Sequence, residues 1–444
     1  MYFTVILISI LTILFELYFG IAEYFLNKLH MFNITKGIPG PKAFPIIGNA
    51  HLFTGDTTAL FKQMLNIGKN YQLLWRMWIG AKLFLIIENP EYVKTLLKSP
   101  YIIDKSKEYE KLKVSLGNGL LTAPDATLNT QLNSLTNPDC KLAESIKCAM
   151  DIVTQRIFKL WLHPNIIFYN TAVGKKFLAC KAYLDNVTTK IIKEKMGSML
   201  KSKINQELTT EKLGQKRKTI FDFLFEISNE EEGYTQEDIR DEINTIITAG
   251  SETTATTISF VLLMLASLPE IQDNVYEEVN RIYCSDDSKN VSMTYDDIKS
   301  MKLLERVIKE TLRLFPIIPI IARKVTQDIK VTSNWTIPKG CSAVFFIYKI
   351  HRNAKYWPRP LVFDPDRFLP ENNSSSYFFP FSYGKRNCIG QQFAMLEIIT
   401  VIATLLKRFR VIIDKPIEIA EIDVKFSITL TPTKPIRLKF ERRN

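Results

Sequence analysis

Residues 381–390 read FSYGKRNCIG, and this stretch decides how the rest of the chain is interpreted. One cysteine, Cys388, follows a glycine and an arginine, and an almost wholly apolar run comes after it. The stretch is either an ordinary loop leading into a buried helix or a loop that holds a thiolate against a partner. The residues around it distinguish the two.

The run after the cysteine, FAMLEIITVIATLL at 393–406, carries one charge and predicts a helix that is buried all round. Cys388 would precede the N-terminus of this helix, where free N–H groups and the helix dipole favour an anion. Arg386 lies two residues before it. Both effects lower the pKa of a thiol. Gly384 and Gly390 would let the backbone approach a flat partner closely.

The loop resembles the haem-binding loop of the cytochrome P450 superfamily, through Phe381, Gly384, Arg386, Cys388 and Gly390. The resemblance implies that these residues bind haem b (iron protoporphyrin IX) and that Cys388 is the axial thiolate ligand of the iron. It also implies a mostly α fold with minor β (α+β), the cytochrome P450 fold. A cysteine hydrolase that pairs Cys388 with His351 is a remote alternative, because no local nucleophile motif accompanies it.

Composition sets limits on the other classes of protein. The chain has 444 residues, a net charge of +12 and six cysteines without a C-x-x-C pair. These counts argue against a zinc ribbon or a disulfide scaffold and favour a reducing compartment. The basic residues are scattered, so a nucleic-acid partner is not expected.

The first 22 residues, MYFTVILISILTILFELYFGIA, carry only the charge of Glu16 and are long enough to span a bilayer. A cleaved signal peptide is the alternative, but a basic region and a small-residue cleavage site are missing. We therefore expect a membrane anchor at 1–26, a proline-rich hinge at 27–49 and a single haem domain at 50–444, with an apparent deletion near 122–135. The lysines that follow the anchor predict that the domain lies on the cytoplasmic side of the membrane. The resemblance to the P450 superfamily implies that this is the endoplasmic reticulum membrane.

Apolar periodicity and turn residues predict the elements of the body. The predicted helices are 89–98, 141–162, 175–208, 235–268, 270–283, 294–314 and 390–409, and the predicted β segments are 83–87, short strands within 317–348 and a hairpin at 422–440. The long helix 235–268 begins with a capping-box pattern at Thr235 and Asp238 and ends before Pro269.

Within that long helix, residues 249–254 read AGSETT. Hydroxyl side chains can bond back to the preceding helical turn and distort it. A solvent-facing polar turn is the simple interpretation, but apolar residues flank the motif and indicate burial. The motif resembles the oxygen-binding helix of the family, which implies that Glu252 and Thr253 relay protons. Related proteins that attach haem covalently carry Glu where this chain has Ala249, so the Cys388–iron bond is expected to be the only direct bond to the cofactor.

Three further arginines and one glutamate match family positions. Glu310 and Arg313 lie three residues apart, which ordinarily means an exposed helix pair. The resemblance instead implies a structural triad with Arg367 of Pro365-Asp366-Arg367-Phe368. Arg323, four residues after Pro319, would bind a haem propionate together with Arg386.

The chain departs from the family pattern after Gly119-Leu120-Leu121, where a helix with W-x-x-x-R is expected. No tryptophan occurs between Trp78 and Trp161, and no arginine between Arg76 and Arg156. The loss of this helix would remove partners of a haem propionate and part of the surface that docks a reductase.

The segment 156–177, RIFKLWLHPNIIFYNTAVGKKF, resembles the microsomal family 4 branch of fatty-acid ω-hydroxylases and insect members. The function implied is a monooxygenase that takes electrons from NADPH-cytochrome reductase, with cytochrome b5 as a second donor. Its substrate would be lipophilic: a fatty acid, a hormone-like lipid or a xenobiotic. An inactive haem- or ligand-binding member is the alternative.

Overall fold

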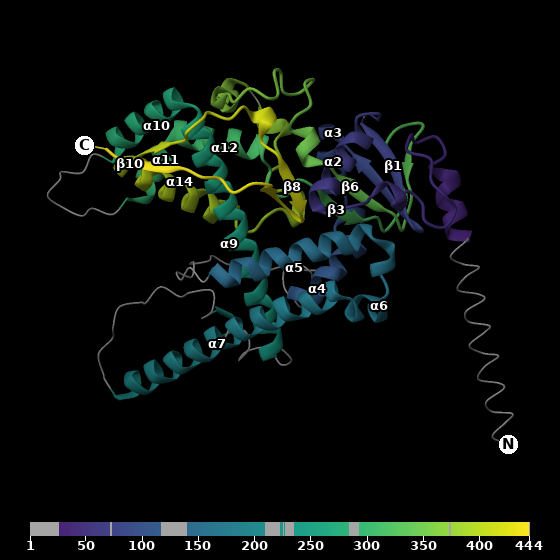
Figure 1. Ribbon diagram of the computed structural model, residues 1–444, viewed down its shortest axis with the longest axis horizontal. Helices are drawn as coiled ribbons and strands as arrows, with labels where there is room; N and C mark the ends of the chain where they lie inside the picture. The colour runs from purple at the N-terminus through teal and green to yellow at the C-terminus, as the bar shows by residue number, and fades with distance from the viewer. Residues whose placement is uncertain are drawn as a thin grey trace.

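The computed structural model describes residues 26–71, 73–116, 140–208, 223–224, 226, 235–283, 293–372 and 374–443. The long helix α9 (Gln236–Ser267) connects two layers of helices (Figure 1). One layer holds α5 and α7; the other holds α10, α12 and α14. A four-stranded sheet lies at the side of the molecule nearer the N-terminus. The architecture is mostly helical with minor β, as the sequence predicts.

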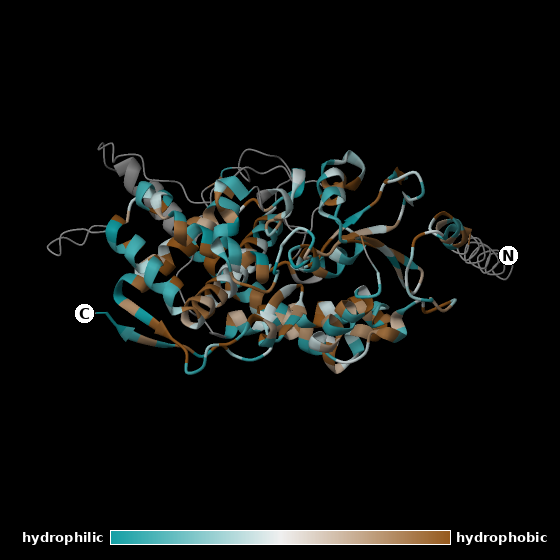
Figure 2. Ribbon diagram, turned by 90° about the horizontal axis from the view of Figure 1, so that it is seen from above, coloured by the Kyte–Doolittle hydropathy of each residue, from teal (hydrophilic) through white to brown (hydrophobic). Residues whose placement is uncertain are grey.

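The helices carry hydrophilic and hydrophobic residues along the same element (Figure 2), as expected for helices with one face in a core. Their bounds are α2 Thr57–Gly68, α3 Pro90–Lys98, α4 Glu110–Leu116, α5 Cys140–Phe158, α6 Asn165–Asn170, α7 Ala172–Leu208, α9 Gln236–Ser267, α10 Pro269–Ile282, α11 Tyr295–Ser300, α12 Lys302–Leu314, α13 Ile347–Ile350 and α14 Gln391–Arg408. The predicted helix at 294–314 is thus two helices, with Met301 between them at φ −78° and ψ 72°.

The strands form one sheet of four and three pairs. Their bounds are β1 Leu74–Ile79, β2 Lys82–Ile87, β3 Ile321–Lys324, β4 Ile329–Lys330, β5 Thr336–Ile337, β6 Ser342–Phe345, β7 Phe409–Ile412, β8 Val424–Ser427, β9 Thr429–Pro432 and β10 Lys439–Arg442. The main sheet has the order β1-β2-β6-β3, with β2 parallel to β6 and the other pairs antiparallel. The predicted C-terminal hairpin is β8–β9, whereas β10 pairs with β7.

Helix α9 has the boundaries that its sequence predicts. The Thr235 hydroxyl accepts the N–H of Asp238, and the Asp238 carboxylate accepts the N–H of Thr235 at 2.8 Å, which completes a capping box. The helix ends before Pro269, the first residue of α10. Its second half, around Phe260, is buried in the main core. Because α9 is fixed at both ends, its middle is held at a defined place in the interior.

Two expectations about single elements are wrong or incomplete. Helix α14 is not buried all round: only Ile398, Ile399, Ile402, Ala403 and Leu406 are buried, because its first turns face a cavity. The expected hinge is docked: Arg76 N–H donates to Pro39 O at 2.8 Å, and the Arg76 guanidinium donates to Thr35 O. Residues 35–49 therefore belong to the globular body.

The predicted membrane anchor, 1–26, lies outside the described residues except for Leu26. Within the described part, only α9 is long and apolar enough to cross a membrane. Since α9 runs through the interior of the domain, its apolar character serves the core and the cavity.

Candidate active site

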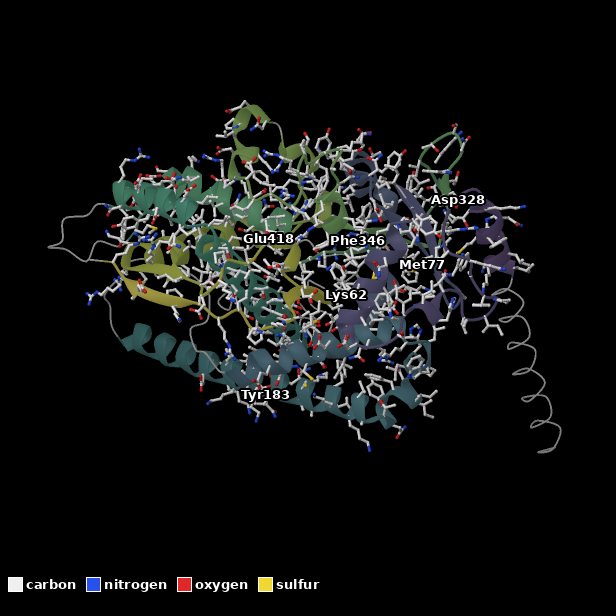
Figure 3. All side chains as sticks on the ribbon, turned by 45° about the horizontal axis from the view of Figure 1, so that its top comes forward. Lys62, Met77, Tyr183, Asp328, Phe346 and Glu418 are labelled. Atoms are coloured by element: carbon white, nitrogen blue, oxygen red, sulfur yellow. The ribbon has the colours of Figure 1, made fainter. Side chains whose placement is uncertain are left out.

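A cavity of about 2060 Å³ lies beside the middle of α9. Its walls come from α9, α5, α7, β1, the β8–β9 turn, the loop before α14 and the first turns of α14. Met77 of β1 and Tyr183 of α7, both labelled in Figure 3, line it from the four-stranded sheet and from the layer of α5 and α7. The lining is mostly apolar, with a few polar and charged side chains, as is usual for a site that takes a small molecule.

Cys388 lines this cavity, and its thiol is accessible from it. Its backbone N–H donates to Phe381 O at 2.9 Å, which closes the loop on itself. The expectation of a lowered thiol pKa is wrong for the protein alone. Loss of solvation raises the pKa of Cys388, and a hydrogen bond from the Gly390 N–H only partly offsets this. A coordinated metal ion would deprotonate the thiol outright.

The two glycines of the loop have different roles. Gly390 lines the cavity beside Cys388, and a Cβ there would lie 3.9 Å from the Cys388 sulfur. Gly384 does not line it. Its φ is +80°, and a Cβ would lie 2.2 Å from Leu97 O at the end of α3. Gly384 therefore permits close packing of the loop on α3 rather than the expected approach to a flat partner.

The AGSETT motif faces the cavity. The Ser251 hydroxyl donates to Ile247 O at 2.5 Å and the Thr253 hydroxyl donates to Ala249 O at 2.6 Å. These bonds confirm that hydroxyls bond back to the preceding turn. Ala249, Gly250 and Ser251 are exposed to the cavity, so the polar turn faces an internal space rather than bulk solvent.

Glu252 also lines the cavity and accepts a hydrogen bond from the Thr429 hydroxyl at 3.2 Å. Burial raises the pKa of its carboxyl, and the Thr429 hydroxyl and the charges of Lys147 and Lys425 partly offset that rise. A buried carboxyl with a raised pKa can hold a proton near neutral pH.

Glu310, Arg313 and Arg367 meet as expected. Glu310 and Arg313 have no exposed side-chain surface, which excludes an exposed helix pair, and Arg367 Nε lies 3.4 Å from Glu310 Oε1. Arg313 also donates to His351 O at 2.8 Å and Pro360 O at 2.9 Å. None of the three lines the cavity. The group therefore connects α12 to the chain that precedes the cysteine loop.

Arg323 and Arg386 both line the cavity, and Arg323 lies on β3 with 3% of its surface exposed. Lys105, which sequence reasoning missed, joins them: its backbone pairs with that of Arg323. Burial and the charges of Arg386 and Arg323 lower the pKa of Lys105 to about 7. No local motif marks this lysine; its role follows only from the pairing of two distant segments.

The donor set suits a flat, apolar macrocycle that carries carboxylates and a metal ion. Cys388 offers one sulfur ligand, Arg323, Arg386 and Lys105 offer cations, and the remaining lining is largely apolar. The mutual repulsion that lowers the pKa of Lys105 would be relieved by an anionic group among the cations. The residues present therefore fit haem.

The structure excludes the Cys388–His351 hydrolase. His351 is fully buried, is absent from the lining of the cavity, and accepts the N–H of Phe379 at 2.8 Å through Nε2. The segment where a helix is missing from the expected pattern, 122–135, lies outside the described residues.

Comparison with known proteins agrees with a haem site. A family model for cytochrome P450 matches residues 124–440. Cytochrome P450 4c3 of Drosophila melanogaster is 30% identical over 454 aligned residues, covering 84% of this chain and 84% of the relative. Cytochrome P450 4V2 of Homo sapiens is 29% identical over 479 residues, covering 91% and 89%. Cytochrome P450 4c21 of Blattella germanica is 29% identical over 479 residues, covering 92% and 93%.

The aligned lengths of 454 and 479 exceed the 444 residues of the chain. Each alignment therefore leaves positions of the relative without a counterpart here.

Proposed function

Because the chain belongs to the cytochrome P450 family of haem-thiolate monooxygenases, we propose that it binds haem b through Cys388 and inserts one oxygen atom of O₂ into a lipophilic substrate. The observation that carries this proposal is the position of Cys388 in one cavity with Glu252 and Thr253. The bound haem supplies the activation of O₂ and the oxygen transfer. The chain's own residues bind and orient the haem and deliver protons.

Arg323, Arg386 and Lys105 would hold the two propionates, because a pair of carboxylates offsets the repulsion among three buried or half-buried cations. The Cys388–iron bond would be the only direct bond to the cofactor, since Ala249 has no carboxylate for an ester. Phe381 and Gly390 would lie beside the ring, while Gly384 supports the loop on α3.

Glu252 would hold a proton on its carboxyl, and Thr253 Oγ1 would pass it toward the oxygen substrate. In the structure the Thr253 hydroxyl donates its proton to Ala249 O, so the relay requires the O–H to turn away from that carbonyl: Oγ1 would accept a proton from a water as its own proton passes toward the oxygen substrate. Consecutive residues of a helix do not face each other, so a water between Glu252 and Thr253 would complete the path.

The apolar lining favours a lipophilic substrate such as a fatty acid, a hormone-like lipid or a xenobiotic. NADPH-cytochrome reductase would supply the electrons, with cytochrome b5 as a second donor. The apolar segment 1–26 would anchor the chain in the endoplasmic reticulum membrane with the domain on the cytoplasmic face.

An impaired, non-catalytic haem- or ligand-binding protein is the second candidate. The observation that favours it is that each alignment described above leaves positions of the relative without a counterpart in this chain. A deletion near 122–135, where the sequence departs from the family pattern, would account for part of this difference.

The experiment is a reduced, CO-bound absorption spectrum of the full-length chain supplied with haemin, followed by turnover of laurate with NADPH-cytochrome reductase. A thiolate-type band that disappears in Cys388→Ala supports haem ligation, and a hydroxylated product supports the enzyme. A thiolate-type band without product, for laurate and for a panel of lipophilic substrates, favours the impaired protein. A thiolate-type band that persists unchanged in Cys388→Ala overturns the proposal.

A further inference from the structure

His351 lies between the Glu310–Arg313 ion pair and the cysteine loop, and neither the cavity nor the proposed proton path uses it. It directly follows α13 and has no exposed surface. Its ring stacks on Phe378, with ring centroids 5.3 Å apart. A fully buried histidine without a surface or cavity contact requires a structural reason.

The ring of His351 is bonded to the start of the cysteine loop. Nε2 lies 2.8 Å from the backbone nitrogen of Phe379. A backbone N–H is a donor only, so Nε2 must be the unprotonated, accepting nitrogen and the ring proton must be on Nδ1. Nδ1 makes no hydrogen bond of standard geometry, but the carbonyls of Leu312 and Arg313 at the end of α12 attract its proton.

The backbone of His351 is bonded to the ion pair. Its carbonyl accepts a hydrogen bond from Arg313 Nη1 at 2.8 Å, and Arg313 is held by Glu310. One residue therefore connects a buried charge pair, through its carbonyl, to the loop, through its ring.

Backbone hydrogen bonds within the loop link Phe379 to Cys388. Phe379 O accepts the N–H of Ser382 at 3.1 Å, and Ser382 has a left-handed φ of +67°. Phe381 O then accepts the N–H of Cys388 at 2.9 Å. Because a left-handed φ is costly for a residue with a side chain, the loop needs fixed points on both sides of it. The Phe379 N–H bond is such a point at its start.

We propose that His351 is a positioning residue for the axial ligand: by accepting the Phe379 N–H, it sets the cysteine loop so that Cys388 can coordinate the iron. This inference rests on the proposed role of Cys388. It assigns His351 no contact with the substrate or the cofactor.

The test compares His351→Leu, which removes the acceptor, with His351→Gln, whose side-chain oxygen can accept the same N–H. Thr311→Val is the matched control, because Thr311 is a buried polar residue of α12 whose hydroxyl bonds only within its helix, to Val307 O at 2.9 Å. Each full-length chain is loaded with haemin, and the ratio of thiolate-type CO band to total haem is measured.

We expect His351→Leu to lower that ratio by about tenfold, the effect of one lost buried hydrogen bond. We expect His351→Gln and Thr311→Val to keep it. A ratio in His351→Leu equal to that of the unchanged protein overturns the inference. An unchanged protein without the thiolate-type band overturns the proposed function instead.

If His351→Leu does not fold, the test is the hydrogen-exchange rate of the Phe379 amide, measured in the unchanged protein and in His351→Gln. A protected Phe379 amide in both supports the inference. An amide that exchanges as fast as in an unfolded peptide overturns it.

Discussion

Glu310 and Arg313 form a bidentate ion pair from which water is excluded: Arg313 Nε lies 2.7 Å from Glu310 Oε2, and Arg313 Nη2 lies 2.8 Å from Oε1. Burial raises the pKa of the Glu310 carboxyl, and the hydrogen bonds and charge of Arg313 oppose that rise. Arg313 therefore stabilises the ionised form of the buried Glu310 carboxyl.

Arg313→Met should lower the free energy of unfolding by about 3–5 kcal/mol, because it removes the bidentate partner of the buried Glu310 carboxylate and leaves only the longer contact with Arg367 Nε at 3.4 Å. The measurement is urea unfolding. Asp366→Asn is the control, since it breaks the pair of Arg306 and Asp366 at 3.2 Å, in which Asp366 is 65% exposed. That control should cost less than about 1 kcal/mol. Equal losses would contradict the role assigned to the buried pair.

Gly384→Ala should displace the cysteine loop from α3. Alanine at a left-handed φ costs roughly 1–2 kcal/mol, and its Cβ would overlap Leu97 O. We expect a lower free energy of unfolding and a lower haem content per chain. In Gly197→Ala, within α7, nothing lies within 4 Å of the new Cβ, so stability should stay or rise by about 0.5–1 kcal/mol. The prediction fails if both variants keep full haem content.

Thr253→Val should consume NADPH but form less product per NADPH, because the proposed proton path loses its hydroxyl. The fall should reach about 10²-fold, the low end for a positioned proton donor. Ser259→Ala is the control: it removes the same kind of back-bond, to Ala255 O at 2.8 Å, from a residue that does not line the cavity. Product and NADPH are measured together. A normal ratio of product to NADPH in Thr253→Val would contradict the path.

Thr429→Val should shift the pH profile of product formation. The Thr429 hydroxyl stabilises the ionised form of Glu252, so its removal raises the pKa of Glu252 further. If Glu252 donates a proton in its neutral form, the alkaline limit of activity moves to higher pH. Thr429→Ser keeps the hydroxyl and should keep the profile of the unchanged protein. Identical profiles for the valine and serine variants would be evidence against this role of Glu252.

Acidification should destabilise the protein through His351. Burial and the charges of Arg313 and Arg352 hold the pKa of His351 well below 6.5, against the weaker pull of the Leu312 and Arg313 carbonyls. The unfolded chain takes up a proton below about pH 6.5 and the folded chain does not, so stability is lost as the pH falls through that value. The slope from this group is at most about 1.4 kcal/mol per pH unit.

His351→Gln should remove that part of the slope, measured as the free energy of unfolding at several pH values on both sides of 6.5. An unchanged slope would show that other groups dominate the acid response.

Local chemistry in the sequence was enough to predict α9, because a capping box and a proline fix its two ends. The resemblance to the P450 family, not local chemistry, predicted that Glu310, Arg313 and Arg367 meet. Local chemistry failed where neighbours come from distant segments. Lys105 gains its place by pairing with Arg323, more than two hundred residues away along the chain.

The burial of helix α14 was also mispredicted, because it depends on what lies around the helix. Its apolar sequence predicts burial on every face, yet its first turns border a cavity, and an apolar wall of a cavity has the composition of a core. The pKa of Cys388 is raised, whereas the sequence predicts that it is lowered. Burial of the sulfur by surrounding protein raises the pKa more than the backbone N–H at the start of the helix lowers it.

The pairing of β2 with β6 sets the order in which this protein can be completed on the ribosome. Phe84 lies opposite Ser342, so about 260 further residues must be synthesised after β2 before its partner strand β6 exists. At usual rates of synthesis this takes roughly 10–50 s. During that interval the apolar strand Lys82–Ile87 has an open edge, which is a template for aggregation. A chain that ends before residue 342 would keep this edge of β2 unpaired, which favours aggregation.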